Sequence, residues 1–333
     1  MIDPVTGFVY PDPWVQACTS PEALDLAASG LGVLTANGTV LRRGFTTGTT
    51  AAAAAKAAVL SLRSPCTGVS LTLPCGLAVR VLAEGSDGCG TCRKDPGDYR
   101  DDVTGGILIR ARAVIGSETV VIAGDGIGRY TRDTPRFRAG DAAISEVARR
   151  SIERAVKEAC REIGVEGAHV TLDLPDGRVV AERTLNSRVG IVGGISLLGT
   201  TGLVEPWDDH LAESVTERIG HADRVVLTTG RIGLAHARRR YPDWEVVLVG
   251  GRIGEGLAAV RGEAVLFGLP ALILKHLWPG ILERFRYPTV EELMVRPEAK
   301  EAIDRAFRET TARYPGLQVV LIDRTGRIIA EGP

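Results

Sequence analysis

Three glycine-rich stretches carry side chains that suit an anionic ligand. They span residues 193–202, 228–233 and 250–256, and the last two share the sequence Gly-Arg-Ile-Gly. Glycine lets the backbone come close to a ligand, and the N–H groups at a helix start favour anions. Arg231 and Arg252 add guanidinium donors that match carboxylates. Such glycines also serve simply to turn a chain, so one loop says little, but three with threonine and arginine predict a ligand site.

None of these loops has the fingerprint of a common nucleotide site. The pattern G-x-x-x-x-G-K-[ST] is missing, and no clean G-x-G-x-x-G is followed by an acidic residue about 20 positions later. A nicotinamide-dependent oxidoreductase is therefore an open alternative, although the dinucleotide-binding motif that would support it is missing.

A dense acidic turn at residues 94–106 is a second candidate for chemistry. Its carboxylates could bind a metal, act as a general base, or hold hydroxyl and amino groups. Asx-turns in a solvated loop explain the same composition equally well. The four aspartates are Asp95, Asp98, Asp101 and Asp102.

The cysteines give little support for a metal site. The chain has six, and Cys89 and Cys92 form one C-x-x-C. A second such pair would indicate zinc, and the sequence has none. We expect free thiols on a glycine-rich loop and no protein-bound metal, although the pair could be redox-sensitive.

Composition and charge exclude several other classes. Forty basic residues against 41 acidic ones give a net charge of −1, which argues against a general nucleic-acid binder. No uncharged apolar run is long enough for a membrane span, and the N-terminus lacks the regions of a signal peptide. No histidine has metal or triad spacing, and G-x-S-x-G and H-E-x-x-H are both missing. The predicted location is the cytoplasm.

The elements that must position these groups fall into two patterns. In the first half, alternating stretches at residues 69–73, 78–82, 107–115, 119–123 and 170–174 predict strands. An alanine run from Ala51 predicts a helix that ends near Leu62, with Thr49 or Thr50 as its N-cap. Residues 141–163 predict an amphipathic helix capped by Asp141. We expect an α+β domain over residues 41–182, after an N-terminal extension of residues 1–40 that holds one short helix at residues 21–28.

From residue 183 onward, short apolar runs alternate with helical patterns; the run at residues 264–267, for example, precedes a long helix expected over residues 271–285. This texture predicts βαβ units around a parallel sheet that is buried on both faces. We expect an α/β domain over residues 183–333, with the boundary between residues 176 and 186. Ligands of such sheets bind outside the carboxyl ends of the strands. The three glycine-rich loops are placed at those ends, the 193–202 loop after the first strand.

Several of these stretches together resemble the CbiD family, the cobalt-precorrin-5B C1-methyltransferases of anaerobic cobalamin synthesis. Residues 41–58 look like the opening signature of that family, and residues 94–106 resemble its acidic turn. Residues 124–128 match its glycine loop, and residues 186–206 match another of its motifs almost residue for residue. The resemblance covers about residues 40–260. With its proline-rich N-terminal extension, the chain looks like the form carried by methanogenic archaea.

Three departures from the family pattern bear on the substrate. The family usually has cysteine where this chain has Thr50, and histidine where it has Gly105. A late stretch of the family, rich in His and Lys, is not recognisable within residues 264–290, where we interpret residues 268–280 as its eroded counterpart. The apolar run at residues 264–278 is either core or an interface with a second copy, so a homo-oligomer stays open.

The resemblance implies a fold and a reaction. The fold is two domains, the first like ribosomal protein S5 domain 2 and the second Rossmann-like. The reaction is methyl transfer from S-adenosylmethionine to C1 of a cobalt-tetrapyrrole bound between them. Because the cobalt comes with the substrate, the protein needs no metal ligand. We expect the S-adenosylmethionine contacts at Gly193, Gly194, Ser196, Gly199, Thr200 and Thr201. We expect the substrate contacts at Thr46, Thr49, Arg231 and Arg252. The expected catalytic residues are Asp101, Asp102 and Thr47.

Two rivals stay open beside this interpretation. One is the nicotinamide-dependent oxidoreductase, which would bind NAD(P)H and not S-adenosylmethionine. The other is a non-catalytic tetrapyrrole carrier or repurposed paralogue, which would bind the ring without turning it over.

Overall fold

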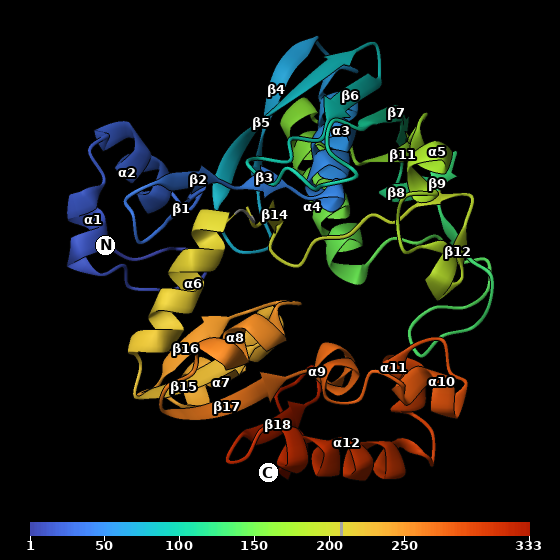
Figure 1. Cartoon of the computed structure of the whole chain (residues 1–333). Helices are drawn as coiled ribbons and strands as arrows, with labels where there is room; N and C mark the ends of the chain where they lie inside the picture. The colour runs from blue at the N-terminus through green and yellow to red at the C-terminus, as the bar shows by residue number, and fades with distance from the viewer. Residues whose placement is uncertain (207–208) are drawn as a thin grey trace. The chain divides into compact units, whose positions relative to one another are not determined.

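A computed structural model describes residues 1–206 and 209–333, without the side chains of residues 209–214 and of Arg231 (Figure 1). The chain forms two compact units, Met1–Asp208 and Asp209–Pro333. Each unit has its own hydrophobic core. In the described part of the chain, no helix is long and apolar enough to cross a membrane.

A six-stranded sheet dominates the first unit. Its order is β4-β5-β6-β7-β11-β8, antiparallel except for the parallel pair of β11 and β8. Strand β5 alternates strictly between exposed and buried residues, because only one face of the sheet is covered. The strands are β4 Cys66–Thr72, β5 Ala78–Ser86, β6 Cys89–Arg93, β7 Leu108–Gly116, β8 Val120–Ala123 and β11 Gly167–Asp173.

The expected strands of this half are all present, but their neighbours differ from simple chain order. Strands β7 and β8 are joined by a short connection, yet β11 lies between them in the sheet. Strand β6 was not predicted, because the Cys-Gly-Thr-Cys stretch lacks the apolar alternation of a strand and was expected to be a loop.

Helix α3 (Thr47–Leu60) packs on the covered face of this sheet and is buried almost along its whole length. Two strand glycines explain its alanine run. A Cβ on Gly90 would overlap the carbonyl oxygen of Ala54, and one on Gly85 would overlap that of Ala57. The helix backbone lies so close to the sheet that only small side chains fit between them. The helix begins earlier than expected, since its N-cap is Thr46 and not Thr49 or Thr50.

Helix α4 (Glu146–Ile163) packs along α3 and against β11 and β8. Its apolar stripe is buried and its charged face is in solvent, as the periodicity predicts. The N-cap is Ser145, whose hydroxyl accepts from the N–H of Ala148 at 3.3 Å, and not Asp141. The helix ends at Gly164, which adopts the left-handed conformation that favours glycine there.

The N-terminal residues form a small cluster of their own within the first unit. Tyr10, Trp14, Ala27 and Leu34 are buried against one another. Helix α2 has the predicted bounds, and Ser20 caps it. The elements are α1 Asp12–Ala17, α2 Pro21–Ala28, β1 Gly32–Leu34 and β2 Val40–Arg42.

The segment that begins at residue 183 belongs to the first unit as far as residue 208. The boundary between the units therefore lies at residue 208 and not within the expected residues 176–186. Its short strands pair only with strands of this unit: β12 with β10, β13 with β9, and β14 with β3. The 193–202 loop therefore does not follow a strand of the parallel sheet. The strands are β3 Gly44–Phe45, β9 Gly126–Ile127, β10 Arg129–Tyr130, β12 Ile191–Val192, β13 Gly194–Ile195 and β14 Leu203–Val204. Helix α5 Gly177–Ala181 and a 3-10 turn, Ser187–Val189, lie between β11 and β12.

The second unit is a five-stranded sheet in the order β16-β15-β17-β18-β19. The first four are parallel and β19 is antiparallel. Val225 and Leu227 face one core and Val226 faces the other, so the sheet is buried on both faces, as predicted. The strands are β15 Arg224–Thr228, β16 Glu245–Leu248, β17 Glu263–Gly268, β18 Gln318–Ile322 and β19 Ile328–Gly332.

The helices of this unit differ from expectation at one point. The long helix expected over residues 271–285 is two helices, because Pro279 and Gly280 interrupt it. The apolar run at residues 264–278 is mainly core, with Phe267 and Leu274 fully buried. The helices are α6 Asp209–His221, α7 Arg231–Arg240, α8 Ile253–Ala259, α9 Pro270–Leu277, α10 Ile281–Phe285, α11 Val290–Leu293 and α12 Ala299–Arg313. The likeness of the two units to ribosomal protein S5 domain 2 and to a Rossmann fold stays a prediction.

Candidate functional site

The 193–202 loop lies over the first turns of α3 and α4. The carbonyl of Leu198 accepts from the N–H of Gly48 in α3 at 2.9 Å. The carbonyl of Leu197 accepts from the N–H of Ser145, the N-cap of α4, at 2.9 Å. The N-terminal ends of both helices therefore meet at this loop. A helix N-terminus carries a partial positive charge, so the loop lies in a positive field.

The threonines of the 44–50 stretch hold this loop in place. The hydroxyl of Thr47 donates to the carbonyl of Ser196 at 3.1 Å and accepts from the N–H of Leu198 at 2.9 Å. The hydroxyl of Thr49 donates to the carbonyl of Gly202 at 2.7 Å. The structure thus brings together two stretches that are about 150 residues apart in the chain. Both hydroxyls are buried and bonded to backbone, so their role here is to position the loop.

Thr46 and Thr50 complete the same contact. The hydroxyl oxygen of Thr46 accepts from the N–H of Thr49 at 3.2 Å and caps α3. The Thr50 hydroxyl donates to the carbonyl of Thr46 at 2.9 Å. Gly199 lies directly against this cap, because a Cβ at that position would overlap the hydroxyl of Thr46. The departure at Thr50 is therefore accommodated by a local hydrogen bond inside the first turn of α3.

The loop residues divide into an inner and an outer group. Ser196 is buried, and its hydroxyl donates to the side-chain oxygen of Asn186 at 3.2 Å. The Asn186 amide donates to the carbonyl of Gly194 at 3.0 Å, so these residues fix the loop from inside. The outer surface is formed by Gly193, Thr200 and Leu198, whose side chain is 54% exposed.

The acidic turn is built around a lysine that the sequence did not single out. Lys94 is 3% exposed, and its ammonium group is paired with the carboxylate of Asp102. Asp102 also accepts from the hydroxyl and the N–H of Thr104, at 2.6 and 2.9 Å. Burial alone would raise the pKa of Asp102, but the bonds from Lys94 and Thr104 outweigh it and hold the pKa below its ordinary value. Asp101 is exposed.

The other two aspartates of the turn bind the strand beside it. The carboxylate of Asp98 accepts from the N–H of Arg42 at 2.6 Å, and that of Asp95 accepts from the Arg42 guanidinium at 3.2 Å. The turn is therefore attached to β2, just before the threonine stretch. Of the four aspartates, Asp101 is the one whose carboxylate has no hydrogen-bond partner in the described part of the chain.

Arg43 is a second buried cation that the sequence did not reveal. Its guanidinium, 4% exposed, donates to both carboxylate oxygens of Asp3, at 3.0 and 2.7 Å, and to Glu205 at 2.9 Å. It also donates to the carbonyls of Gly30 and Gly32. The Arg43 side chain thereby joins the N-terminal extension, through Asp3, to the end of the 186–206 motif, through Glu205. Its neighbour Arg42 is exposed, and an Arg-Arg pair gives no sign of which one is buried.

Cys89 and Cys92 lie on strand β6 and not on a loop. Cys89 is exposed and Cys92 is buried, because residues three apart on a strand point to opposite faces. Their Cα atoms are about 10 Å apart at strand spacing, which is beyond the reach of a disulfide. In the described part of the chain, no three His, Cys, Asp or Glu side chains gather as a metal site would require.

Arg231 and Arg252 belong to the second unit. Arg231 is the first residue of α7, and its side chain lies outside the described part of the structure. Arg252 is the N-cap of α8, and its guanidinium lies 3.3 Å from the carboxylate of Glu255. Both follow carboxyl ends of adjacent parallel strands, β15 and β16, as the sequence predicts. The structure does not bring them together with the threonines within one unit.

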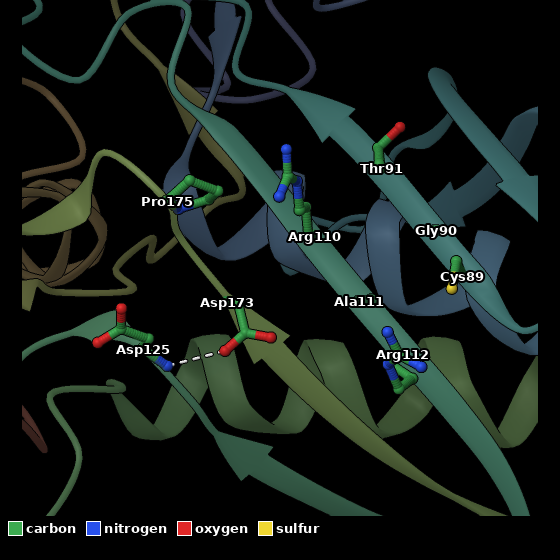
Figure 2. A pocket seen from close by; sticks show the side chains of 9 residues that line it. All are labelled: Cys89, Gly90, Thr91, Arg110, Ala111, Arg112, Asp125, Asp173 and Pro175. Carbon is green, nitrogen blue, oxygen red and sulfur yellow. Dashed lines mark hydrogen bonds between the residues drawn. The ribbon is translucent and has the colours of Figure 1, made fainter.

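A pocket of about 380 Å³ lies on the uncovered face of the six-stranded sheet (Figure 2). Strands β6, β7 and β11 form its floor, and the loop before β9 forms one side. Its lining residues are Cys89, Gly90, Thr91, Arg110, Ala111, Arg112, Asp125, Asp173 and Pro175. No sequence pattern indicates this pocket, because its arginines lie on a strand with ordinary alternation.

Comparison with known proteins identifies one family. The CbiD family profile matches residues 34–206, which nearly coincide with the part of the first unit that carries the loop, the threonines and the acidic turn. The chain belongs to the CbiD family. A protein named cobalt-precorrin-5B C(1)-methyltransferase from Methanoculleus marisnigri is 52% identical to this CbiD chain, with all of both chains covered. One of the same name from Methanospirillum hungatei is 48% identical, with 99% of each chain covered.

A solved structure supports the same assignment. The crystal structure of the cobalamin biosynthesis protein CbiD from Archaeoglobus fulgidus matches with a TM-score of 0.73 and 38% identity, and the match covers 86% of this chain and 97% of that one. The full-length relatives also span the second unit and the N-terminal extension of this CbiD chain. Neither the carrier nor the oxidoreductase alternative is favoured by these names.

Proposed function

We propose that this chain transfers the methyl group of S-adenosylmethionine to C1 of cobalt-precorrin-5B and yields cobalt-precorrin-6A. Full-length identity of up to 52% to curated proteins named for that activity supports the proposal. The structural observation that carries it is the glycine-rich loop at the meeting point of two helix N-termini. We place the reaction in the cytoplasm.

The outer surface of the 193–202 loop is the proposed contact for S-adenosylmethionine. Gly193 has a positive φ of 80°, and a Cβ there would meet nothing within 4 Å, so its backbone is open to a ligand. The methionine carboxylate of the co-substrate suits the positive field of α3 and α4. Thr200 offers an exposed hydroxyl beside it. Ser196, Gly194 and Thr201 support the loop from inside or through their backbone.

The reaction needs alignment more than a protein nucleophile. The ring carbon attacks the methyl group, the bond from sulfur to methyl breaks, and its electron pair stays on sulfur. The positive charge left on the ring is removed when a carboxylate accepts a proton. The exposed carboxylate of Asp101 is the proposed acceptor, and Asp102 holds Lys94 and the shape of the turn. Arg252, Arg231 and Thr46 are the proposed contacts for substrate carboxylates.

Calorimetric titration of the full chain tests the proposal. S-adenosylmethionine and S-adenosylhomocysteine should bind, NADH should not, and cobalt-precorrin-5B should gain one methyl group by mass spectrometry. Thr200→Val should weaken S-adenosylmethionine binding about fivefold, because one hydrogen bond is lost. Thr67→Val, at an exposed position on β4, is the matched control and should bind normally. NADH binding without S-adenosylmethionine binding would favour an oxidoreductase, and ring binding without methylation would favour a carrier.

A further inference from the structure

The pocket on the uncovered sheet face holds two guanidinium groups side by side. Arg110 and Arg112 are two residues apart on β7, and both are exposed on the face turned away from α3 (Figure 2). At strand spacing their Cα atoms are about 7 Å apart. Neither side chain has a hydrogen bond or ion pair with any residue that the structure describes.

The cross-strand neighbours of these two arginines include one acidic residue. Across the strands, Arg112 lies opposite Cys89 on β6 and Thr171 on β11, both uncharged. Arg110 lies opposite Thr91 and Asp173. The Asp173 carboxylate accepts from the N–H of Asp125 at 2.8 Å and forms no ion pair with Arg110.

The second acidic residue of the pocket, Asp125, forms an ion pair with an arginine outside the pocket. The carboxylate of Asp125 accepts from the Arg178 guanidinium at 3.1 Å, and these bonds lower the pKa of Asp125. The pocket therefore presents two guanidinium groups that form no ion pair within the described part of the chain, beside two carboxylates whose hydrogen bonds are made to other groups. Paired guanidinium groups in a pocket are suited to a ligand with two carboxylates.

The chain that lines one side of the pocket also pairs with the glycine-rich loop. Asp125 lines the pocket, and it directly precedes β9. Strand β9 pairs with β13, which begins at Gly194 of the loop. The pocket and the loop therefore belong to the same unit and share the segment at residues 125–127.

We propose that Arg110 and Arg112 bind the two carboxylates of one acetate and propionate pair on the edge of the tetrapyrrole substrate. This inference rests on the proposed function for the identity of the ligand. In such macrocycles the two acid chains stand on adjacent carbons of a pyrrole ring, so their carboxylates diverge from one corner. A pocket of about 380 Å³ takes such a corner and leaves the remaining ring outside.

Binding of uroporphyrin, whose four pyrrole rings each carry one acetate and one propionate, tests the inference without turnover. The Arg110→Gln/Arg112→Gln double variant should bind it at least tenfold more weakly, because two charge-assisted contacts are lost. Arg80→Gln is the matched control, since Arg80 is exposed on the same sheet face outside the pocket. Arg112→Lys should bind with intermediate affinity. Mesoporphyrin, which lacks acetate chains, should not distinguish the double variant from the wild type.

A second readout uses the unaltered protein. Cys89 lines the pocket opposite Arg112, so bound uroporphyrin should slow alkylation of its thiol by iodoacetamide. Cys18, in the N-terminal cluster, is the internal control and should react at an unchanged rate. Equal uroporphyrin affinity of the wild type and the double variant, no protection of Cys89, or no binding to the wild type would each overturn the inference.

The two proposals fail in different ways. S-adenosylmethionine binding should be the same in the double variant and the wild type, because the 193–202 loop is untouched. A wild type that binds uroporphyrin through the arginines but not S-adenosylmethionine would refute the proposed methyl transfer and leave the carboxylate pocket standing. Normal S-adenosylmethionine binding with no effect of the arginines would do the reverse.

Discussion

Gly48 in α3 and Ala148 in α4 touch where the first turns of the two helices lie side by side: a Cβ on Gly48 would stand 2.8 Å from the Cβ of Ala148. Further along both helices, Lys56 donates to Glu158 at 2.8 Å. Two contacts in the same order show that the helices run parallel. Parallel dipoles repel each other mildly, but they add their positive ends at one place, which is the 193–202 loop.

The contact at Gly48 predicts that a single methyl group there is harmful. Helix propensity alone favours Gly48→Ala by about 1 kcal/mol. The added Cβ would also stand 2.9 Å from the carbonyl oxygen of Leu198, so we expect a net loss of about 2 kcal/mol from overpacking. Urea denaturation measures it. Gly251→Ala, which places its Cβ in open space, is the control, and a more stable G48A protein would disprove the close contact.

The pair of Lys94 and Asp102 predicts a stability that depends on pH. Asp102→Asn should lower the free energy of unfolding at pH of about 7 by about 3 kcal/mol, because a buried ammonium group loses its charged partner. The folded-state pKa of Asp102 lies below the ordinary value of 3.8, so its stabilisation is complete above that pH and is lost as pH falls through the folded-state value.

The difference between wild type and D102N should therefore shrink as the pH falls below about 4. Urea denaturation over a pH series checks this. Asp101→Asn, at the exposed neighbouring position, should change stability by less than about 0.5 kcal/mol at every pH. A difference between wild type and D102N that is independent of pH would mean that Asp102 acts through shape and not through charge.

The buried ion pair between Arg43 and Asp3 predicts that the Arg43 side chain holds the N-terminal extension in place. Arg43→Met should destabilise the protein by about 4 kcal/mol, because the carboxylate of Asp3 stays buried without its partner. Limited proteolysis should then cut within residues 1–30 much faster than in the wild type. Arg42→Met, whose guanidinium is 53% exposed, is the matched control. Equal cleavage rates of R43M and R42M would show that the apolar cluster around Trp14 holds the extension alone.

Because the C-x-x-C stretch lies on a strand, we expect the thiols of Cys89 and Cys92 to differ in reactivity. Burial raises the pKa of Cys92 to about 12, so its reactive thiolate is scarce at neutral pH. Iodoacetamide should label Cys89 in the native protein and label Cys92 only after unfolding, as peptide mass spectrometry can measure. Mild oxidation should leave the two unlinked. A disulfide between them in folded protein would contradict the strand assignment.

The sequence predicted the elements whose side chains follow a regular period. Helix α4 shows this, since its apolar stripe has helical spacing. The strands of the parallel sheet were predicted from a second signal, their short apolar runs, such as residues 225–227 in β15. Strand β6 was missed because Gly90 is selected by the closeness of α3 and not by strand propensity. The caps of α3 and α4 were misplaced because several hydroxyl and carboxyl residues near each start could serve as a cap.

The sequence predicted which segments form the candidate site but not how these segments contact one another. The motifs at residues 41–58 and 186–206 were recognised, but their mutual contact joins distant parts of the chain and no local pattern reports it. The domain boundary was misplaced for the same reason, since β13 pairs with β9 across about 70 residues of sequence. Lys94 and Arg43 were missed because a sequence does not show which cation will be buried.

The glycines beneath α3 have a consequence for the accuracy of the site. Gly85 and Gly90 let the helix rest on the sheet backbone, and the first turn of the same helix holds the 193–202 loop through Thr47 and Thr49. The distance between α3 and the sheet therefore also sets the position of the 193–202 loop. A methyl group inserted under the middle of α3, far from any ligand, would shift the loop as a rigid body. Tolerance to mutation in this protein should therefore be lowest at some of its smallest and most deeply hidden residues.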